Sequence, residues 1–463
     1  MKRCDAKLAP DQDERSVSGK RRINVTTMNY PQVLFKNRHA DRIATREEYE
    51  ASGGYKALRR ILAEGGRNEV QAAVQEATLL GRGGAAFPMG IKLSTVAENA
   101  PFPRYLVCNA DEMEPGTFKD RVLLHADPHQ LIEGMALTAY AVQAAKGIVF
   151  IRPEYENAAR ILEREVALAR QAGYLGEKIL GSDFSFEIDV HRSGGRYICG
   201  EVTAQLNALM GRRPNPQQPP PYPTESGLWG RPTVLQNVET LCCVPHIVRN
   251  GAEWFKGLAL TKTGAGTKLF PVSGMVNRPG CYELPMGIRL SAIIEEHAGG
   301  MRPGSEFKAC LPGGASTQFL TRQYYDIPMD FESLKKAGHR LGTGAIMVFD
   351  HRTCMVAATL NLMDFFARES CGWCTPCREG LPYIRDILQR IEMGEGEEAF
   401  IPMLEEMSRY LWNAYCAFAP GAVSPLQGLL TYFRDEVQEH ITARKCPFRE
   451  NGSATTPNPS KTD

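Results

Sequence analysis

The sequence predicts an α/β domain with a largely parallel sheet, then a small mixed sheet, and finally a C-terminal bundle of helices. Helix-like and strand-like stretches alternate through the first half of the 463 residues. Short strand-like pieces with frequent Gly and Pro follow, and amphipathic helical stretches fill the last quarter. Alternation of this kind is typical of helices packed on a parallel sheet, whereas strands and helices that occur in separate runs indicate further domains.

Four stretches in the first half carry this pattern. Residues 128–147 read as a buried helix, 147–151 (GIVFI) as an apolar strand, 153–176 as a helix with Pro153 near its first turn, and 184–190 as an alternating strand. We therefore expect a Rossmann-like nucleotide-binding domain. Such sheets bind nucleotides in loops at the carboxyl ends of their strands.

The middle and the end of the chain differ from this domain. Short strand-like pieces surround one helix-like stretch, 290–299, which predicts a small mixed sheet with a structural or docking role. Helical periodicity then recurs at 355–369, 381–394 and 426–441. The expected domains are a mobile extension at 1–30, the α/β domain at 31–255, the mixed sheet at 256–340, the bundle at 341–445 and a disordered tail at 446–463.

Composition excludes several classes of protein. With 43% hydrophobic and 23% charged residues the chain is globular, and its net charge of +1 provides no field for nucleic acid. No apolar run reaches the roughly 18 residues that a membrane-spanning helix needs. The opening residues lack the apolar stretch of a signal peptide, so we expect a cytosolic protein.

Three of the thirteen cysteines form an unusual group. The odd total and scattered positions argue against a disulfide framework, and most cysteines read as buried small hydrophobes. Cys371, Cys374 and Cys377 are instead spaced as C-x-x-C-x-x-C. This spacing favours a [4Fe–4S] cluster, while zinc remains an alternative because thiolates serve both. We expect Cys416 as the fourth ligand, because Cys446 begins the polar tail.

Three loops are candidates for a nucleotide site. The first, GRGGAAFPMGIK, has glycines that allow backbone amides to approach a phosphate, although a plain turn fits it equally well. In the second, CNADEMEP, a strand ends in an acidic cluster that suits a solvated turn, a divalent metal or the edge of a flavin. The third runs from RYICGE into a proline-rich segment, which we expect to lie across the same domain with Tyr222 free to stack on a base.

Six motifs in order, GRGGAAFP, NADEMEPGTFKDR, RYICGE, NVETL, ESCGWCTPCR and CAFAPGAV, carry a resemblance. From about residue 30 to 441 the chain resembles the flavin-bearing, NADH-oxidising subunits of bacterial respiratory complex I. The resemblance implies FMN and NADH binding by the α/β domain, a ubiquitin-like β-grasp in the middle, and one [4Fe–4S] cluster on the bundle. It implies an NADH dehydrogenase that passes a hydride to flavin and then single electrons to the cluster.

The resemblance also implies roles for individual residues. Phe87 and Tyr222 would sandwich the adenine, Glu114 would meet the nicotinamide carboxamide, and Tyr197 and Glu201 would line the nucleotide cavity. The expected cofactor-binding residues are Gly81, Arg82, Gly83, Gly84, Phe87, Lys92, Asn109, Asp111, Glu112, Glu114, Gly200, Glu201, Val202, Tyr222 and Asn237. The expected cluster ligands are Cys371, Cys374, Cys377 and Cys416.

Three positions depart from the family pattern. Ala86 replaces a glycine of the glycine loop, Val202 replaces a glutamate that resembles a ribose ligand, and Pro219 replaces a lysine beside the same nucleotide. Loss of a charged hydrogen bond weakens binding by about 10- to 150-fold. We therefore expect weakened NADH binding and relaxed exclusion of NADPH.

Three alternative functions remain open at this point: the diaphorase subunit of an NAD-linked hydrogenase or formate dehydrogenase, an FMN and cluster relay or scaffold that does not oxidise NADH, and a zinc-stapled structural protein. The resemblance implies a thioredoxin-like [2Fe–2S] subunit and a large iron–sulfur subunit as partners. Quinone and membrane would be reached only through the complex, in its peripheral arm.

Overall fold

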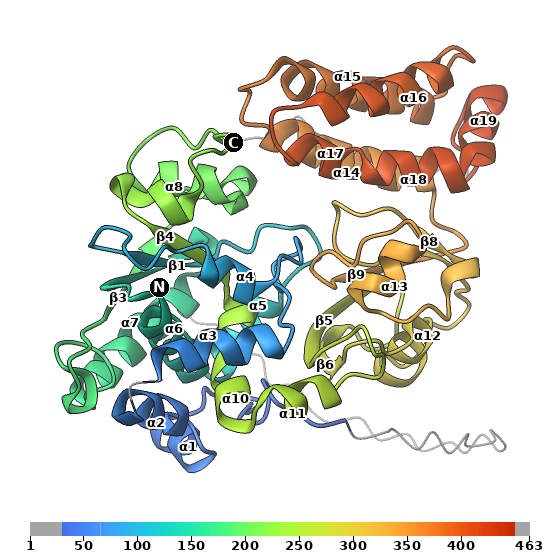
Figure 1. The fold of residues 1–463 in the computed structure, drawn as a ribbon. Coiled ribbons are helices and arrows are strands. Elements are labelled where there is room, and N and C mark those ends of the chain that lie inside the picture. Colours follow the sequence, from blue (N-terminus) through green and yellow to red (C-terminus); the bar gives the residue numbers. More distant parts are fainter. Residues whose placement is uncertain (1–29, 65, 450–463) are drawn as a thin grey trace, which may run out of the picture.

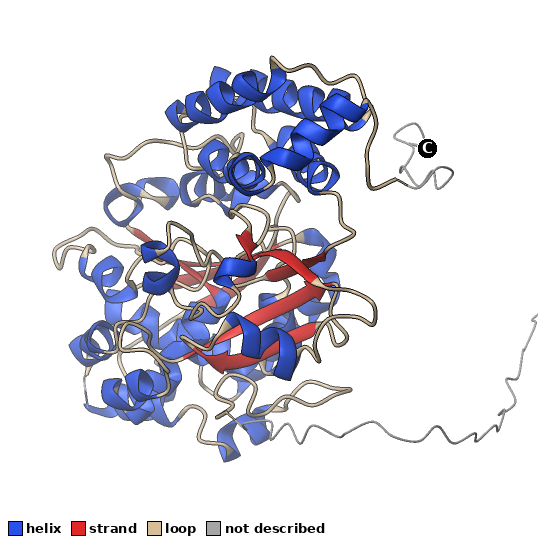
Figure 2. Ribbon diagram, turned by 90° about the vertical axis from the view of Figure 1, so that its right-hand side faces the viewer, coloured by secondary structure: helices blue, strands red, loops and turns tan. Residues whose placement is uncertain are grey.

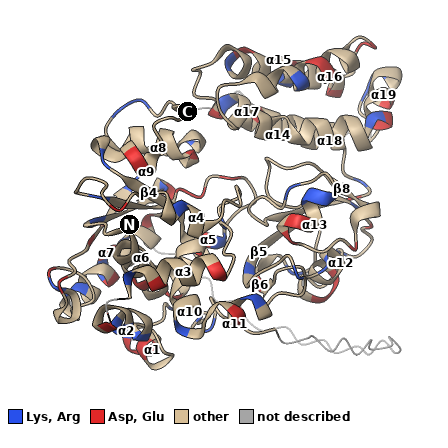
Figure 3. Ribbon diagram, in the orientation of Figure 1, with Lys and Arg blue, Asp and Glu red and all other residues tan. Residues whose placement is uncertain are grey.

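The computed structural model describes residues 30–64 and 66–449 of the chain. The expected N-terminal extension and most of the expected tail lie outside these residues. Figure 2 shows the strands in the lower part of the molecule and the C-terminal helices as a separate layer above them. Figure 3 shows both signs of charge scattered over all parts of the ribbon, as the net charge of +1 suggests.

The first part of the chain builds a four-stranded parallel sheet in the order β3-β2-β1-β4, which confirms the predicted parallel α/β fold. Its strands are β1 (Tyr105–Ala110), β2 (Lys146–Ile151), β3 (Glu187–Arg192) and β4 (Thr233–Asn237). The chain proceeds from β1 outward to β3 and then returns to the other side of β1. Parallel sheets bind ligands where the strand order reverses in this way, so the boundary between β1 and β4 is where a nucleotide site is expected.

Helices cover this sheet on both faces. They are α1 (Arg46–Ala51), α2 (Lys56–Glu64), α3 (Arg67–Glu76), α4 (Met89–Ser94), α5 (Lys119–Ala126), α6 (Pro128–Val142), α7 (Glu156–Gln171), α8 (Val202–Leu209), α9 (Pro223–Ser226), α10 (Val238–Asn250) and α11 (Ala252–Gly257). Helix α6 is buried along almost its whole length and begins with Pro128, whose missing N–H costs nothing in a first turn. Strand β4 follows the proline-rich segment, and α10 begins directly after it.

The second sheet has five strands in the order β6-β5-β9-β7-β8. They are β5 (Thr267–Gly274), β6 (Gly280–Pro285), β7 (Phe307–Leu311), β8 (Leu320–Thr321) and β9 (Ile346–Asp350), with α12 (Leu290–Ala292), a π-helical turn (Ile293–His297) and α13 (Phe331–Lys336) beside them. Strand β9 is hydrogen-bonded between β5 and β7. The expected boundary at residue 340 is therefore wrong, because this sheet needs a strand that ends at Asp350.

Six helices complete the described part of the chain and lie over both sheets (Figure 1). They are α14 (Met355–Glu369), α15 (Thr375–Glu392), α16 (Phe400–Tyr410), α17 (Phe418–Ala422), α18 (Ser424–Tyr432) and α19 (Arg434–Ala443). The single helix expected over 426–441 is two helices, because Phe433 leaves the helical conformation at φ −132°. Within the described residues, no helix is long and apolar enough to cross a membrane.

Candidate functional site

The strand ends Asn109 and Asn237 lie side by side where β1 and β4 pair, at the reversal of the strand order. The Asn109 side chain donates to Gly200 O at 3.1 Å and accepts from Asp111 N at 3.1 Å. The Asn237 side chain donates to Asp120 Oδ2 at 2.6 Å and begins α10 by accepting from Glu239 N. Two of the predicted cofactor residues are thereby fixed at the edge of the parallel sheet.

The glycine loop reaches the same edge. It is closed by the hydrogen bond from Gly81 N to Phe87 O and by a bridge between Leu80 and Pro88. A Cβ on Gly83 would lie 3.1 Å from Asn237 Cβ, so the loop backbone passes close to β4. Gly84 has φ +114°, a conformation that residues with side chains rarely adopt. These contacts place a backbone loop against the carboxyl end of the sheet.

Two charged residues of the loop face inward. The Arg82 side chain is buried and donates to Ala265 O at 2.6 Å, and its backbone N–H donates to Thr240 Oγ1. The Lys92 ammonium donates to Leu235 O at 3.0 Å and lies over the Phe87 ring. The guanidinium of Arg82, one of the expected cofactor-binding residues, is therefore part of the interior in this conformation.

In the acidic cluster after β1, Asp111 and Glu112 have different environments. Burial raises the pKa of Asp111 to about 6, the hydroxyl of Ser193 donates to its Oδ1 at 2.7 Å, and its Oδ2 is buried without a partner among the described residues. Burial also raises the pKa of Glu112 to about 7, and its carboxylate accepts from Asp120 N and Arg121 N at the start of α5. Glu112 thus positions α5, whereas Asp111 leaves an acceptor for a ligand.

Glu114 has a different environment. One oxygen accepts from Tyr197 Oη at 2.6 Å and the other from Ser316 N at 2.6 Å, and burial raises its pKa above the usual range. A Cβ on Gly314 would lie 2.5 Å from Glu114 Cγ, so this position needs glycine. The second sheet, for which a structural or docking role is expected, therefore supplies a loop to the candidate site.

An ion-pair group beneath Asn237 was not expected from the sequence. The Lys119 ammonium lies 2.7 Å from Asp120 Oδ1, 3.0 Å from Glu239 Oε2 and 3.1 Å from Asn237 Oδ1. These charged residues lie within the motifs NADEMEPGTFKDR and NVETL. Buried charges need such pairing, so the opposite charges of these two distant motifs were the available signal.

Tyr197 joins the nucleotide domain to the C-terminal helices. Its backbone N–H donates to Glu369 Oε2 at 2.9 Å, at the end of α14. Its ring packs edge-on against Phe365, Phe366 and Phe418. Because Glu369 stands two residues before Cys371, Tyr197 lies between Glu114 and the cysteine loop.

The four predicted cluster cysteines line one cavity. Cys371, Cys374, Cys377 and Cys416 surround it together with apolar side chains. Burial raises the pKa of Cys377 to about 12 and that of Cys416 to about 11, and the neighbouring thiols act in the same direction. A bound metal ion would favour the thiolate form of these two residues, because a coordinating thiol is deprotonated. The Tyr415 amide points at Cys374 Sγ at 3.5 Å, so the donor set fits an iron–sulfur cluster.

Cys446 is not part of a polar tail, contrary to the expectation. It is buried beyond the end of α19, away from the cysteine cavity. The sequence did not indicate this position, because it depends on how residues 444–449 fold back on the helical layer, where Arg449 pairs with Glu392.

The remaining predicted residues lie around the opening of the site. Glu201 begins α8 and accepts from Thr203 N and Ala204 N, and Val202 is partly buried in the first turn of the same helix. Phe87 and Tyr222 expose 48% and 57% of their surfaces, respectively, so both rings are accessible for stacking. The proline-rich segment reaches the cysteine loop, where Gln218 Nε2 donates to Tyr415 O at 2.7 Å.

Three family models match the chain. They are the Nuo51 FMN-binding domain over residues 74–246, the SLBB domain over 269–320, and the NADH-ubiquinone oxidoreductase-F iron–sulfur binding region over 357–440. The ranges fall on the parallel sheet, the mixed sheet and the C-terminal helices.

Relatives match over most of the chain. The F-type subunit of the NADH-quinone oxidoreductase of Salmonella typhimurium is 51% identical over 405 residues, 87% of this chain and 90% of its own. One such protein of Rhizobium meliloti, the second of its type by name, is 50% identical over 401 residues, 86% of this chain and 95% of its own. A solved NAD+-reducing [NiFe]-hydrogenase chain superposes with a TM-score of 0.73 at 36% identity, over 82% of this chain. This chain spans 63% of that hydrogenase chain, slightly less than two thirds.

Proposed function

The chain belongs to the family of F-type subunits of NADH-quinone oxidoreductase, and from this premise we propose how its residues perform electron input from NADH. It is an NADH dehydrogenase subunit, a flavoprotein of electron transport that uses FMN and a [4Fe–4S] cluster. When bound, FMN accepts a hydride from NADH and the cluster carries the electrons onward one at a time toward quinone. The residues of this chain bind these groups, orient them and hold them at a fixed separation.

The observation that carries the proposal is the position of Tyr197. Its hydroxyl donates to Glu114, and its ring packs against Phe365 and Phe366, which precede the cysteine loop. A nucleotide held at the sheet edge and a cluster held by the cysteines would therefore be separated by one partly buried residue. Because the bound groups are held close together, electron transfer between them needs no acid–base pair.

We assign the flavin to the edge of β1 and β4. The backbone of Gly81 to Gly84 would cradle its phosphate, while Asn109, Asp111 and Asn237 would meet polar atoms of the flavin. The unpartnered Asp111 Oδ2 supports this assignment, because a buried acceptor without a donor is costly. Other predicted residues would support the site without touching the flavin. Glu112 holds the start of α5, Gly200 O accepts from the Asn109 side chain, and Lys92 would hold the loop beside β4.

NADH would lie over the flavin with its adenine between Phe87 and Tyr222 and its carboxamide at Glu114. Tyr197 and Glu201 would line this cavity. Val202 and Pro219 would lack the carboxylate and the ammonium expected of the family, so we propose weakened NADH binding and relaxed exclusion of NADPH. Fewer charged contacts to the adenosine half provide the physical reason.

We propose a β-grasp for the mixed sheet and a four-cysteine cluster site on Cys371, Cys374, Cys377 and Cys416 for the helical bundle. The corresponding domains would span 31–255, 256–350 and 351–449. The chain is a subunit of a complex. Its proposed partners are a thioredoxin-like [2Fe–2S] subunit and a large iron–sulfur subunit, within the peripheral arm of a membrane-bound complex.

A diaphorase role in an NAD-linked hydrogenase is the second candidate, which the structural likeness to the hydrogenase chain supports. The identities of 50% and 51% to the two bacterial oxidoreductase subunits favour the quinone-linked complex. Co-purification would distinguish the two roles, because a hydrogenase would bring nickel-containing subunits.

An anaerobic titration of the reconstituted protein with NADH, and separately NADPH, tests the proposal. We expect NADH to bleach the flavin band and to produce the electron paramagnetic resonance signal of a reduced cluster. A flavin that only dithionite reduces would overturn the dehydrogenase assignment in favour of a relay or scaffold.

A further inference from the structure

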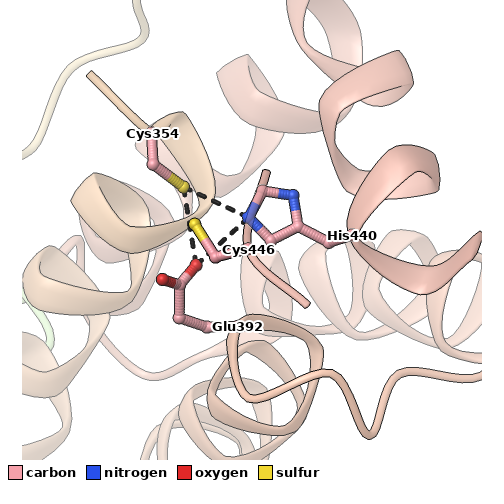
Figure 4. A group of neighbouring side chains, drawn as sticks. All are labelled: Cys354, Glu392, His440 and Cys446. Atoms are coloured by element: carbon pink, nitrogen blue, oxygen red, sulfur yellow. Dashed lines mark hydrogen bonds and ion pairs between the residues drawn. The ribbon is translucent and has the colours of Figure 1, made fainter. Parts of the chain in front are cut away.

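Four side chains meet at the far end of the C-terminal helices, and we propose that they form a structural zinc site. They are Cys354 before α14, Glu392 at the end of α15, His440 in α19 and Cys446 after α19 (Figure 4). Their candidate ligand atoms all lie within 4.8 Å of one another, and three of the four residues are buried. The descriptions of the matching families name no metal at this place beyond the iron of the cluster.

The distances among three of these atoms suit one tetrahedral ion. Cys354 Sγ lies 3.3 Å from His440 Nε2 and 3.4 Å from Glu392 Oε2, and His440 Nε2 lies 3.3 Å from Glu392 Oε2. Zinc binds nitrogen and oxygen at about 2.0–2.2 Å and sulfur at about 2.3 Å, so neighbouring ligand atoms of a tetrahedron lie about 3.3–3.8 Å apart. Cys354, Glu392 and His440 thus already have the separations that zinc requires, and Cys446 Sγ lies within 4.8 Å of their ligand atoms.

Hydrogen bonds around the group orient each ligand. The Nδ1 of His440 lies 2.6 Å from Glu436 O, which fixes the proton on Nδ1 and leaves the Nε2 lone pair directed at the group. Ala357 N donates to Cys354 Sγ at 3.3 Å, and Arg449 holds Glu392 Oε1 at 2.9 Å while Oε2 faces the sulfurs. Outer contacts of this kind are characteristic of metal ligands.

The donor set distinguishes this site from the cysteine cavity. Two thiolates, an imidazole and a carboxylate form a closed four-ligand set suited to zinc, which has no redox chemistry. The cysteine cavity lies at the opposite ends of the same two helices, since Cys371 follows α14 and Cys374 precedes α15. The 18 residues of α15 place the two sites about 27 Å apart.

The proposed zinc has a mechanical task. Helices α14 and α15 are joined by the cysteine loop at one end, and the zinc would clamp their other ends to α19 and to the last described residues. Fixing the helix pair at both ends would hold the cysteine loop at a constant position against Tyr197. This inference does not depend on the nucleotide that the protein oxidises.

Metal analysis of the purified holoprotein tests the proposal. We expect about one zinc per chain beside the iron of the cluster, with zinc bound by two sulfur and two nitrogen or oxygen ligands in X-ray absorption. A content below about one tenth of a zinc ion per chain, in iron-replete protein from zinc-supplemented cells, would overturn the proposal. Zinc bound by four sulfur ligands, or by oxygen and nitrogen ligands alone, would also overturn it.

Variants locate the zinc. Cys446→Ala and His440→Gln should each lower the zinc content at least tenfold while iron and FMN stay, and Cys310→Ala, a buried cysteine in β7, should leave zinc unchanged. Zinc retained by both site variants would also overturn the assignment. If a site variant does not accumulate, the ligand count of the wild-type protein decides between the outcomes.

Discussion

The hydroxyl of Tyr197 donates a 2.6 Å hydrogen bond to the half-buried carboxylate of Glu114. The bond joins residues 83 positions apart, and Tyr197 also bonds to Glu369 through its backbone. One residue therefore connects the nucleotide domain with the helix that leads into the cysteine loop.

Tyr197→Phe removes this bond and leaves Glu114 with the Ser316 amide. Because a hydrogen bond to a charged group contributes about 1.5–3 kcal/mol, we expect flavin reduction by NADH to lose about 10- to 150-fold in efficiency. Rapid-mixing spectroscopy of the flavin band measures the rate of this reduction. The iron and FMN contents of the variant should equal those of the wild-type protein. Tyr432→Phe is the control, because the Tyr432 hydroxyl contacts only Tyr324 and His339 among the hydrogen bonds of the described residues. An unchanged rate would contradict the role of Glu114.

Asp111 makes the flavin-free protein sensitive to pH. Its pKa is raised by burial to about 6, above the value near 3.9 of an unfolded chain, so the native state binds more protons between these values. Stability therefore falls as pH rises through about 4 to 6 and carries the full penalty at pH 7.

Asp111→Asn should remove that penalty and raise the free energy of unfolding at pH 7 by about 1–3 kcal/mol, with a smaller gain at pH 5. Urea unfolding at the two pH values measures the difference. The exposed Asp183→Asn should show no gain. A gain that is equal at both pH values would show that ionisation is not the cause. FMN affinity should fall in the same variant.

Ala86 has φ +56°, in the left-handed region that favours glycine. Ala86→Gly should stabilise the protein by about 1 kcal/mol, because the strain of a side chain there exceeds the entropy cost of glycine. The neighbouring Ala85→Gly has no positive φ to relieve and should destabilise. Equal destabilisation by both, measured as unfolding midpoints, would argue against strain in this loop.

Val202→Glu restores a carboxylate at the first residue of α8. We expect NADH to bind about 10- to 150-fold more tightly, and NADPH less tightly because its 2′-phosphate is repelled. Val202→Gln keeps the size without the charge and should not reject NADPH. Equilibrium titration of both variants gives the ratio, and identical NADPH binding by the two would refute the charge argument.

Cys416→Ser should abolish the cluster, since the four cysteines of the cavity act as one ligand set. Iron content and the paramagnetic resonance signal of the reduced protein should both disappear. Cys446→Ser is the matched control and should retain the iron, because Cys446 lies at the other end of the helices. If Cys446→Ser loses the iron and Cys416→Ser keeps it, Cys446 and not Cys416 is the fourth ligand of the cluster.

Local sequence patterns were sufficient for much of the fold. Apolar periodicity predicts α6, α7 and α14, a short apolar run predicts β2, and alternation predicts β3, because each pattern depends on neighbours within a few residues. The break at Phe433 was missed, since the apolar repeat continues through it. The boundary near 340 was also missed, because β9 is assigned by pairing with strands about 40 to 75 positions earlier.

The family motifs, the order of the domains and the spacing of the first three cysteines can be read from the amino-acid sequence alone. Folding brings Ser316 to Glu114, turns Arg82 inward and places Cys446 beside Cys354 instead of in a free tail. These contacts differ from the motifs in their separation along the chain. Periodicity and spacing encode local geometry, whereas contacts across 90 to 200 residues depend on how complete elements pack against one another.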